Sequence, residues 1–126
     1  MRLNIICVDK SPCALSGLMQ QIRCLMPGAA VHGCRSPDEA IGYAQAEGCD
    51  VLLTDTDLAR AHTDGFMLAE RIQAINPRVN IIFITEQTDG KYACAAYRLH
   101  ASGYLTKPFD PEDLDAEFAN LRFAAG

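Results

Sequence analysis

The chain has 126 residues, of which 49% are hydrophobic and 21% are charged, and it contains no tryptophan. This length suits one domain with one core, so we expect residues 1–126 to form a single domain. The formal net charge of −5 argues against nucleic acid as a direct ligand, because phosphate binding needs a concentrated basic face. No apolar run approaches the roughly 18–20 residues that span a bilayer, and the N-terminus at residues 1–4 lacks the long apolar core of a signal peptide.

The cysteine pattern bears on compartment and metal binding. The six cysteines are Cys7, Cys13, Cys24, Cys34, Cys49 and Cys94. No two of them form a Cys-x-x-Cys pair, and no histidine stands at zinc-finger spacing from them. We therefore expect reduced and mostly buried thiols, which together with the absence of an export signal favours the cytoplasm. Because His32, His62 and His100 come from different predicted elements, a metal cluster is not expected.

The first half of the chain alternates strand and helix patterns. Residues 3–8 form an apolar run that predicts a strand. Ser11 then supplies a helix N-cap with Pro12 at the first helical position, and Pro27-Gly28 ends that helix. A weaker second strand is predicted over residues 30–34.

A second and a third unit follow with the same alternation. The run Ser-Pro-Asp-Glu at residues 36–39 is a capping box, and the helix that it starts ends at Gly48. Residues 51–54 predict a buried strand, followed by a loop over residues 55–65. A third helix is predicted over residues 66–75.

The last two units complete the pattern. Residues 79–84 are the most apolar stretch and predict the fourth strand, which is followed by a fourth helix. Residues 102–106 predict a short fifth strand, and Asp110 starts a fifth helix. Five strand–helix units with short turns predict an α/β fold with a parallel sheet and helices on both faces. We expect the flavodoxin-like (βα)5 arrangement with strand order 2-1-3-4-5.

Polar residues close four of these strands. Asp9, Asp55, Thr85 and Lys107 follow strands 1, 3, 4 and 5, which are neighbours in the predicted order. Each residue taken alone has an ordinary explanation as a helix cap, a strand end or a solvated charge, but together they predict one crevice. Two acids repel unless a cation lies between them, and Mg²⁺ meets this need with a few protein oxygens and several waters.

The chemistry of such a crevice is phosphoryl transfer. Asp55 is a carboxylate nucleophile that is able to accept a phosphoryl group. Lys107 and the metal would neutralise the transferred oxygens, and Thr85 would donate a hydrogen bond to one of them.

Four segments of the chain also carry a family resemblance. They are residues 6–9, residues 50–55 followed by Asp64-Gly65, residues 82–85 and residues 103–109. In their order and spacing these segments make the chain similar, over essentially its whole length, to receiver domains of two-component response regulators. The resemblance implies that a sensor histidine kinase phosphorylates Asp55.

The resemblance also implies the roles of the surrounding residues. Asp9, Asp55 and the backbone carbonyl of Asp57 are expected to hold Mg²⁺. Thr85 and Lys107 match the family's hydroxyl and lysine, which bind the phosphoryl group. Tyr104 matches the aromatic residue that turns inward when the threonine moves. The bond from Lys107 to its following proline is expected to be cis.

The output is implied only in outline. The face built from the fourth helix, fifth strand and fifth helix is expected to switch, and to control an output or partner or to form a homodimer. Residues 100–110 resemble regulators with a LytTR-type DNA-binding output. An output domain would be absent or would lie beyond the segment.

Three departures from the family pattern define an alternative. Lys10 stands where receivers carry a second metal-binding acid, which should weaken Mg²⁺ binding, and it is also placed to pair with Asp55. Residues 58–63 form a longer loop without the usual Met-Pro pair, and Glu86 adds negative charge at the mouth. The alternative is therefore a receiver-like interaction module that acts without phosphorylation.

A third hypothesis comes from a different class, a small flavodoxin-like enzyme or flavin binder. It would need a phosphate-cradling loop after the first strand. Residues 9–13 contain an acid and no glycine, which ranks this hypothesis last.

Overall fold

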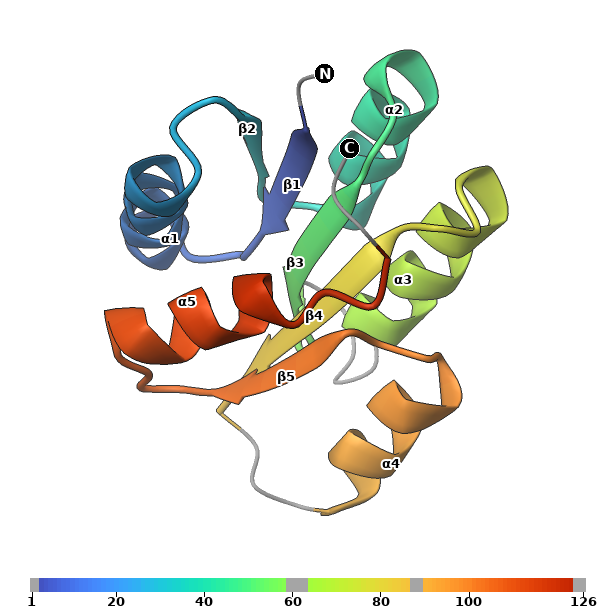
Figure 1. The fold of residues 1–126 in the computed structure, drawn as a ribbon. Helices are drawn as coiled ribbons and strands as arrows, with labels where there is room; N and C mark the ends of the chain where they lie inside the picture. Colours follow the sequence, from blue (N-terminus) through green and yellow to red (C-terminus); the bar gives the residue numbers. More distant parts are fainter. Residues whose placement is uncertain (1–2, 59–63, 87–89, 124–126) are drawn as a thin grey trace.

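The computed structural model describes residues 3–58, 64–86 and 90–123. The strands are β1 (Asn4–Val8), β2 (Ala30–Cys34), β3 (Val51–Asp55), β4 (Asn80–Thr85) and β5 (Gly103–Thr106). The helices are α1 (Pro12–Leu25), α2 (Pro37–Glu47), α3 (Asp64–Ile75), α4 (Gly90–Arg98) and α5 (Pro111–Ala119). All five strands run parallel in one sheet of order β2-β1-β3-β4-β5 (Figure 1). The predicted fold class and strand order are confirmed.

The sheet has a hydrophobic core on each face. Successive strand residues point to opposite faces, so that Ile6 and Leu52 join the core under α2, α3 and α4, whereas Ile5 and Leu53 join the core under α1 and α5 (Figure 1). Every residue of β3 and β4 is buried. Because helices cover both faces, these central strands are apolar along their length instead of alternating.

Local signals start and stop the helices where the sequence predicts. The Ser11 hydroxyl accepts a hydrogen bond from the Ala14 N–H, and the Ser36 hydroxyl accepts one from the Glu39 N–H, each at 3.3 Å. Gly48 ends α2 with φ +87°, a conformation that glycine adopts without strain. Helix α3 ends at Ile75 as predicted, and it begins at Asp64, slightly before the predicted start at about residue 66.

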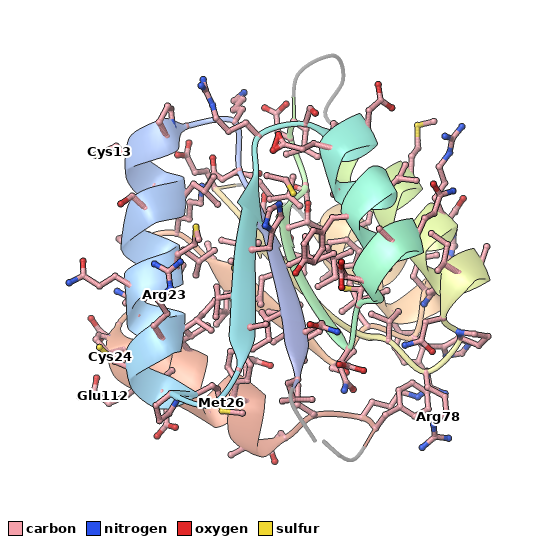
Figure 2. All side chains as sticks on the ribbon, turned by 90° about the horizontal axis from the view of Figure 1, so that it is seen from above. Cys13, Arg23, Cys24, Met26, Arg78 and Glu112 are labelled. Carbon is pink, nitrogen blue, oxygen red and sulfur yellow. The ribbon has the colours of Figure 1, made fainter. Side chains whose placement is uncertain are left out.

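The cysteines correct one prediction. All six are free thiols, as expected, but only Cys7, Cys34 and Cys49 are buried. Figure 2 shows Cys13 and Cys24 on the outward side of α1. They are three helical turns apart and therefore share one face, whereas the buried face of α1 belongs to Leu15, Leu18 and Ile22.

The longest helix of the described residues is too short for a membrane. Helix α1 has 14 residues, about 21 Å at the usual rise, whereas the hydrocarbon core of a bilayer is about 30 Å thick. Among the described ranges, no helix has the length and apolar character of a membrane span.

Candidate functional site

The carboxyl ends of β1, β3, β4 and β5 meet at one edge of the sheet and form a hollow of about 250 Å³. Its lining comprises Asp9, Lys10, Ser11, Ala14, Asp55, Asp57, Thr85, Glu86 and Lys107. The convergence of these strand ends, which the strand order predicts, is present in the structure. We call this hollow the acid site.

Two buried carboxylates share one ammonium group in the acid site. Asp9 is 4% exposed and Asp55 is 8% exposed. Lys107 Nζ donates to Asp9 Oδ2 at 2.9 Å and to Asp55 Oδ2 at 2.8 Å. Burial by itself would lower the pKa of Lys107, but its hydrogen bonds to Asp55 and Asp9 outweigh burial and raise the pKa above its ordinary value. Lys107 therefore stays charged and holds the two acids together.

The second oxygen of each carboxylate is held by a backbone amide. The Ser11 N–H donates to Asp9 Oδ1 at 2.9 Å, and the Asp57 N–H donates to Asp55 Oδ1 at 2.9 Å. These bonds fix the orientation of both carboxylates. An ionised carboxylate has about four acceptor positions, so both acids retain capacity for a further ligand.

Lys10 lies at the rim and does not pair as predicted. Its Nζ is 3.6 Å from Asp57 Oδ2, and its side chain is 53% exposed. The predicted pairing of Lys10 with Asp55 is wrong: Lys10 pairs with the Asp57 carboxylate, whereas the Asp55 oxygens accept hydrogen bonds from Lys107 and the Asp57 amide. Four acids (Asp9, Asp55, Asp57 and Glu86) and two lysines (Lys10 and Lys107) line the acid site, which gives it a formal charge of −2.

Thr85 is bound to a residue that the sequence analysis did not single out. Thr56 Oγ1 donates to Thr85 Oγ1 at 2.9 Å, and both side chains are fully buried. The Thr56 N–H donates to the Ile84 carbonyl at 3.1 Å, and the Lys107 N–H donates to the Thr85 carbonyl at 2.7 Å. The only sequence signal for Thr56 was its position directly after Asp55.

Tyr104 lies on β5 and is half-buried against the core under α2, α3 and α4, as is Leu99. Tyr97, on α4, is instead 81% exposed.

The peptide bond between Lys107 and Pro108 is cis, as the resemblance implied.

Gly65 explains the close fit between β3 and α3. Its N–H donates to the Thr56 carbonyl at 3.0 Å. A Cβ at this position would collide with the backbone carbonyl of Asp55 and would lie 2.7 Å from Thr56 Cα. Glycine is therefore required where α3 begins, directly behind Asp55. Residues 59–63 of the predicted longer loop lie outside the described residues.

A second, larger hollow adjoins the acid site. It has a volume of about 590 Å³ and is lined by Asp9, Ala14, Gly17, Leu18, Gln21, Ile84, Glu86, Lys107, Pro108 and Phe109. Glu86 is exposed and lines both hollows. Its predicted position at the mouth of the site is confirmed.

The family comparison agrees with this geometry. Residues 5–119 match the model of the response regulator receiver domain. The chain belongs to the response regulator receiver domain family. It is the receiver domain of a two-component response regulator, which is a signalling domain.

Most of this chain also matches parts of two curated relatives that have different names. The cyclic di-GMP phosphodiesterase response regulator RpfG of Xanthomonas campestris pv. campestris is 30% identical over 121 residues, covering 94% of this chain and 32% of RpfG. The sensory transduction protein LytT of Bacillus subtilis is 27% identical over 110 residues, covering 87% of this chain and 44% of LytT. The chain thus spans less than half the length of these relatives.

A solved structure supports the same fold. The signal receiver domain of an HD domain-containing protein from Pseudomonas fluorescens Pf-5 has a TM-score of 0.84 at 25% identity, with 94% of this chain and 93% of that chain covered. These findings favour a receiver domain over a flavin binder, and none of them favours the phosphorylation-independent module over a phosphorylated receiver.

Proposed function

We propose that Asp55 accepts a phosphoryl group from a sensor histidine kinase. The observation that carries this proposal is the shared Lys107 ammonium, 2.8 Å from Asp55 Oδ2 and 2.9 Å from Asp9 Oδ2. It places a partly buried positive charge beside the Asp55 carboxylate, where the transferred group brings its negative charge. Asp55 is also the acid at the end of β3, the middle strand of the sheet.

The transfer is a displacement at phosphorus. One Asp55 carboxylate oxygen attacks the phosphorus of a phosphohistidine on the kinase, so that a P–O bond forms while the P–N bond breaks. The departing imidazole keeps the electron pair of the broken bond and takes up a proton from solvent. Lys107 neutralises the phosphoryl oxygens, and the Asp57 amide holds the other Asp55 oxygen in place.

The donor set of the acid site fits Mg²⁺. Asp9, Asp55 and the backbone carbonyl of Asp57 would hold the ion, because carboxylate and carbonyl oxygens are the ligands of a hard cation. When bound, Mg²⁺ supplies further neutralisation of the transferred phosphoryl oxygens. Lys10 lies 3.6 Å from the Asp57 carboxylate and adds positive charge next to the ion, so binding is weaker than with an acid at this position.

Phosphorylation would act through Thr85 and Tyr104. Thr85 Oγ1 accepts a hydrogen bond from Thr56, and the Thr85 O–H would donate to an oxygen of a phosphoryl group on Asp55. Tyr104 is half-buried on the neighbouring strand, and its packing would change when Thr85 moves. This shifts the population between two packings of the face formed by α4, β5 and α5. That face would then control an output domain or form a homodimer.

Acetyl phosphate tests the proposal directly. The full chain with acetyl phosphate and Mg²⁺ should gain the mass of one phosphoryl group, measured by intact-protein mass spectrometry. Asp55→Asn should gain none, whereas Asp50→Asn, at the opposite end of β3, should behave as the wild type.

A wild type that neither gains this mass nor binds beryllofluoride in the presence of Mg²⁺ would overturn the proposal. The interaction module without phosphorylation would then be the remaining candidate. It predicts partner binding that Asp55→Ala leaves unchanged.

A further inference from the structure

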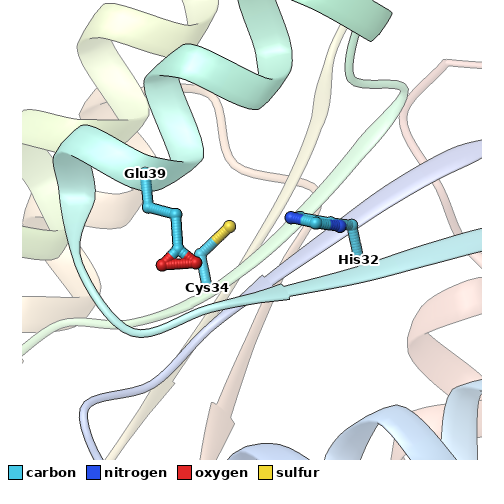
Figure 3. A group of neighbouring side chains, drawn as sticks. All are labelled: His32, Cys34 and Glu39. Carbon is cyan, nitrogen blue, oxygen red and sulfur yellow. The ribbon is translucent and has the colours of Figure 1, made fainter.

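A second group of potential metal ligands lies on the edge strand of the sheet. His32 and Cys34 are two residues apart on β2, so their side chains lie on the same face of the sheet. Glu39 comes from the first turn of α2. One ligand atom from each side chain lies within 4.8 Å of the others. Figure 3 shows the three side chains converging between β2 and the start of α2.

Local contacts hold this group in place. The His32 ring stacks on the Tyr43 ring, with centroids 3.9 Å apart and an angle of 5° between the planes. Tyr43 is four residues after Glu39, so both side chains lie on the same side of α2. The Glu39 N–H is bound by the Ser36 hydroxyl at the helix N-cap. The imidazole plane and the first turn of α2 are therefore both fixed.

The donor atoms differ in kind from those of the acid site. An imidazole nitrogen, a thiolate sulfur and a carboxylate oxygen together suit Zn²⁺, whereas Mg²⁺ prefers oxygen alone. Cys34 is fully buried, His32 is half-buried and Glu39 is exposed. A cation bound here would have protein on the Cys34 side and solvent on the Glu39 side, which leaves room for a water as fourth ligand.

We propose that His32, Cys34 and Glu39 form a binding site for Zn²⁺ or a similar transition-metal ion, with water completing a tetrahedral set. Binding exchanges the thiol proton for the metal: the S–H bond breaks, the sulfur keeps the electron pair and donates it to Zn²⁺, and the proton leaves to solvent. Burial, and then the nearby Glu39 charge, raise the pKa of the Cys34 thiol to about 12, so the metal-free side chain carries that proton at neutral pH.

The consequence for the fold is a link between α2 and the edge strand. Residues 32 and 34 belong to β2, which pairs only with β1 in the described sheet, and Glu39 belongs to α2. The Cys34 carbonyl also accepts the Asp9 N–H at 3.2 Å. The proposed zinc site therefore stiffens the edge strand one hydrogen bond away from Asp9, and it does not depend on the proposed phosphorylation of Asp55.

Cobalt(II) is the probe that tests this site, because a thiolate bound to Co²⁺ gives a charge-transfer absorption that carboxylates do not give. The reduced, metal-free full chain should develop this absorption and lose it when Zn²⁺ is added. Cys34→Ser should abolish it. Cys24→Ser, on the exposed side of α1, should leave it intact. An absent band, or a band that persists in Cys34→Ser, would overturn the proposal.

Glu39→Gln separates ligation from folding, because Glu39 is exposed and the substitution keeps its shape. Zinc affinity, measured by competition with a chromophoric chelator, should fall by at least ~10–100-fold. This is the loss typical for an outer-shell partner, and Glu39 is proposed as a direct ligand. His32→Gln should weaken binding similarly. Tyr43→Leu should also weaken it and Tyr43→Phe should restore it, because the ring stack positions the imidazole. Unchanged affinity in Glu39→Gln would rule out the three-residue site.

Discussion

The acid site has an inner and an outer lysine–aspartate group, and the two groups contribute differently to stability. In the inner part Lys107, only 21% exposed, bridges the buried carboxylates of Asp9 and Asp55 at hydrogen-bond distance. In the outer part Lys10 and Asp57 are 3.6 Å apart and considerably exposed. Exposed pairs typically contribute about 0–1 kcal/mol, whereas loss of one partner from a buried pair leaves an uncompensated charge. The lower exposure of Lys107 therefore makes it, and not Lys10, the lysine that stabilises the carboxylates of the site.

The largest expected effect comes from removing the inner cation. Lys107→Met should lower the free energy of unfolding by about 3 kcal/mol, because it leaves two buried carboxylates without their shared partner. Lys10→Met is the matched control and should cost less than about 1 kcal/mol. Urea unfolding of both variants at neutral pH measures the difference, and equal losses would contradict the distinction between the two parts.

The pH dependence sharpens the same comparison. The pKa of Lys107 is raised in the folded state, so its stabilising contribution is complete below the unfolded value of about 10.4 and is lost as pH rises through the higher folded value. The stability gap between wild type and Lys107→Met should therefore persist to about pH 10 and close above it. A gap that closed between pH 8 and 9 would contradict this assignment.

The next largest effect concerns the backbone behind Asp55. Gly65→Ala should destabilise the fold by about 1–3 kcal/mol, because the added methyl group collides with the Asp55 backbone. Gly42→Ala is the matched control within α2, where a Cβ meets no atom within 4 Å, and it should stabilise by roughly 0.5–1 kcal/mol. Thermal unfolding of both variants provides the test. A stabilised Gly65→Ala variant would show that α3 can move away from β3 without cost, so that glycine is not required at residue 65.

The smallest expected effect concerns the rim. Lys10→Asp should tighten Mg²⁺ binding by about tenfold, equivalent to about 1.4 kcal/mol, because it replaces a repelling ammonium with a carboxylate. Titration calorimetry of wild type and variant measures this gain, with Lys91→Asp as a charge-matched control on α4. Equal gains in both variants would mean that total charge, and not the position of residue 10, controls the affinity.

The sequence by itself determined the elements and the strand order. Ser11 and Ser36 marked two helix starts, and β2 was predicted at its observed bounds of Ala30–Cys34. These signals are local: a cap, a proline or an apolar period acts within one turn or one strand. The strand order then brings Asp9, Asp55, Thr85 and Lys107 to one edge, because parallel strands present their carboxyl ends on the same side.

Only the tertiary structure decided which groups are partners. Both Lys10 and Lys107 were predicted close to the acids of the crevice. In the structure, Lys107 binds Asp9 and Asp55. Lys10 instead lies at the rim beside Asp57. Thr56 became significant through a hydrogen bond to a residue 29 positions away. His32, Cys34 and Glu39 meet because α2 packs beside β2, and no fixed spacing in the sequence encodes a contact between a strand face and a neighbouring helix.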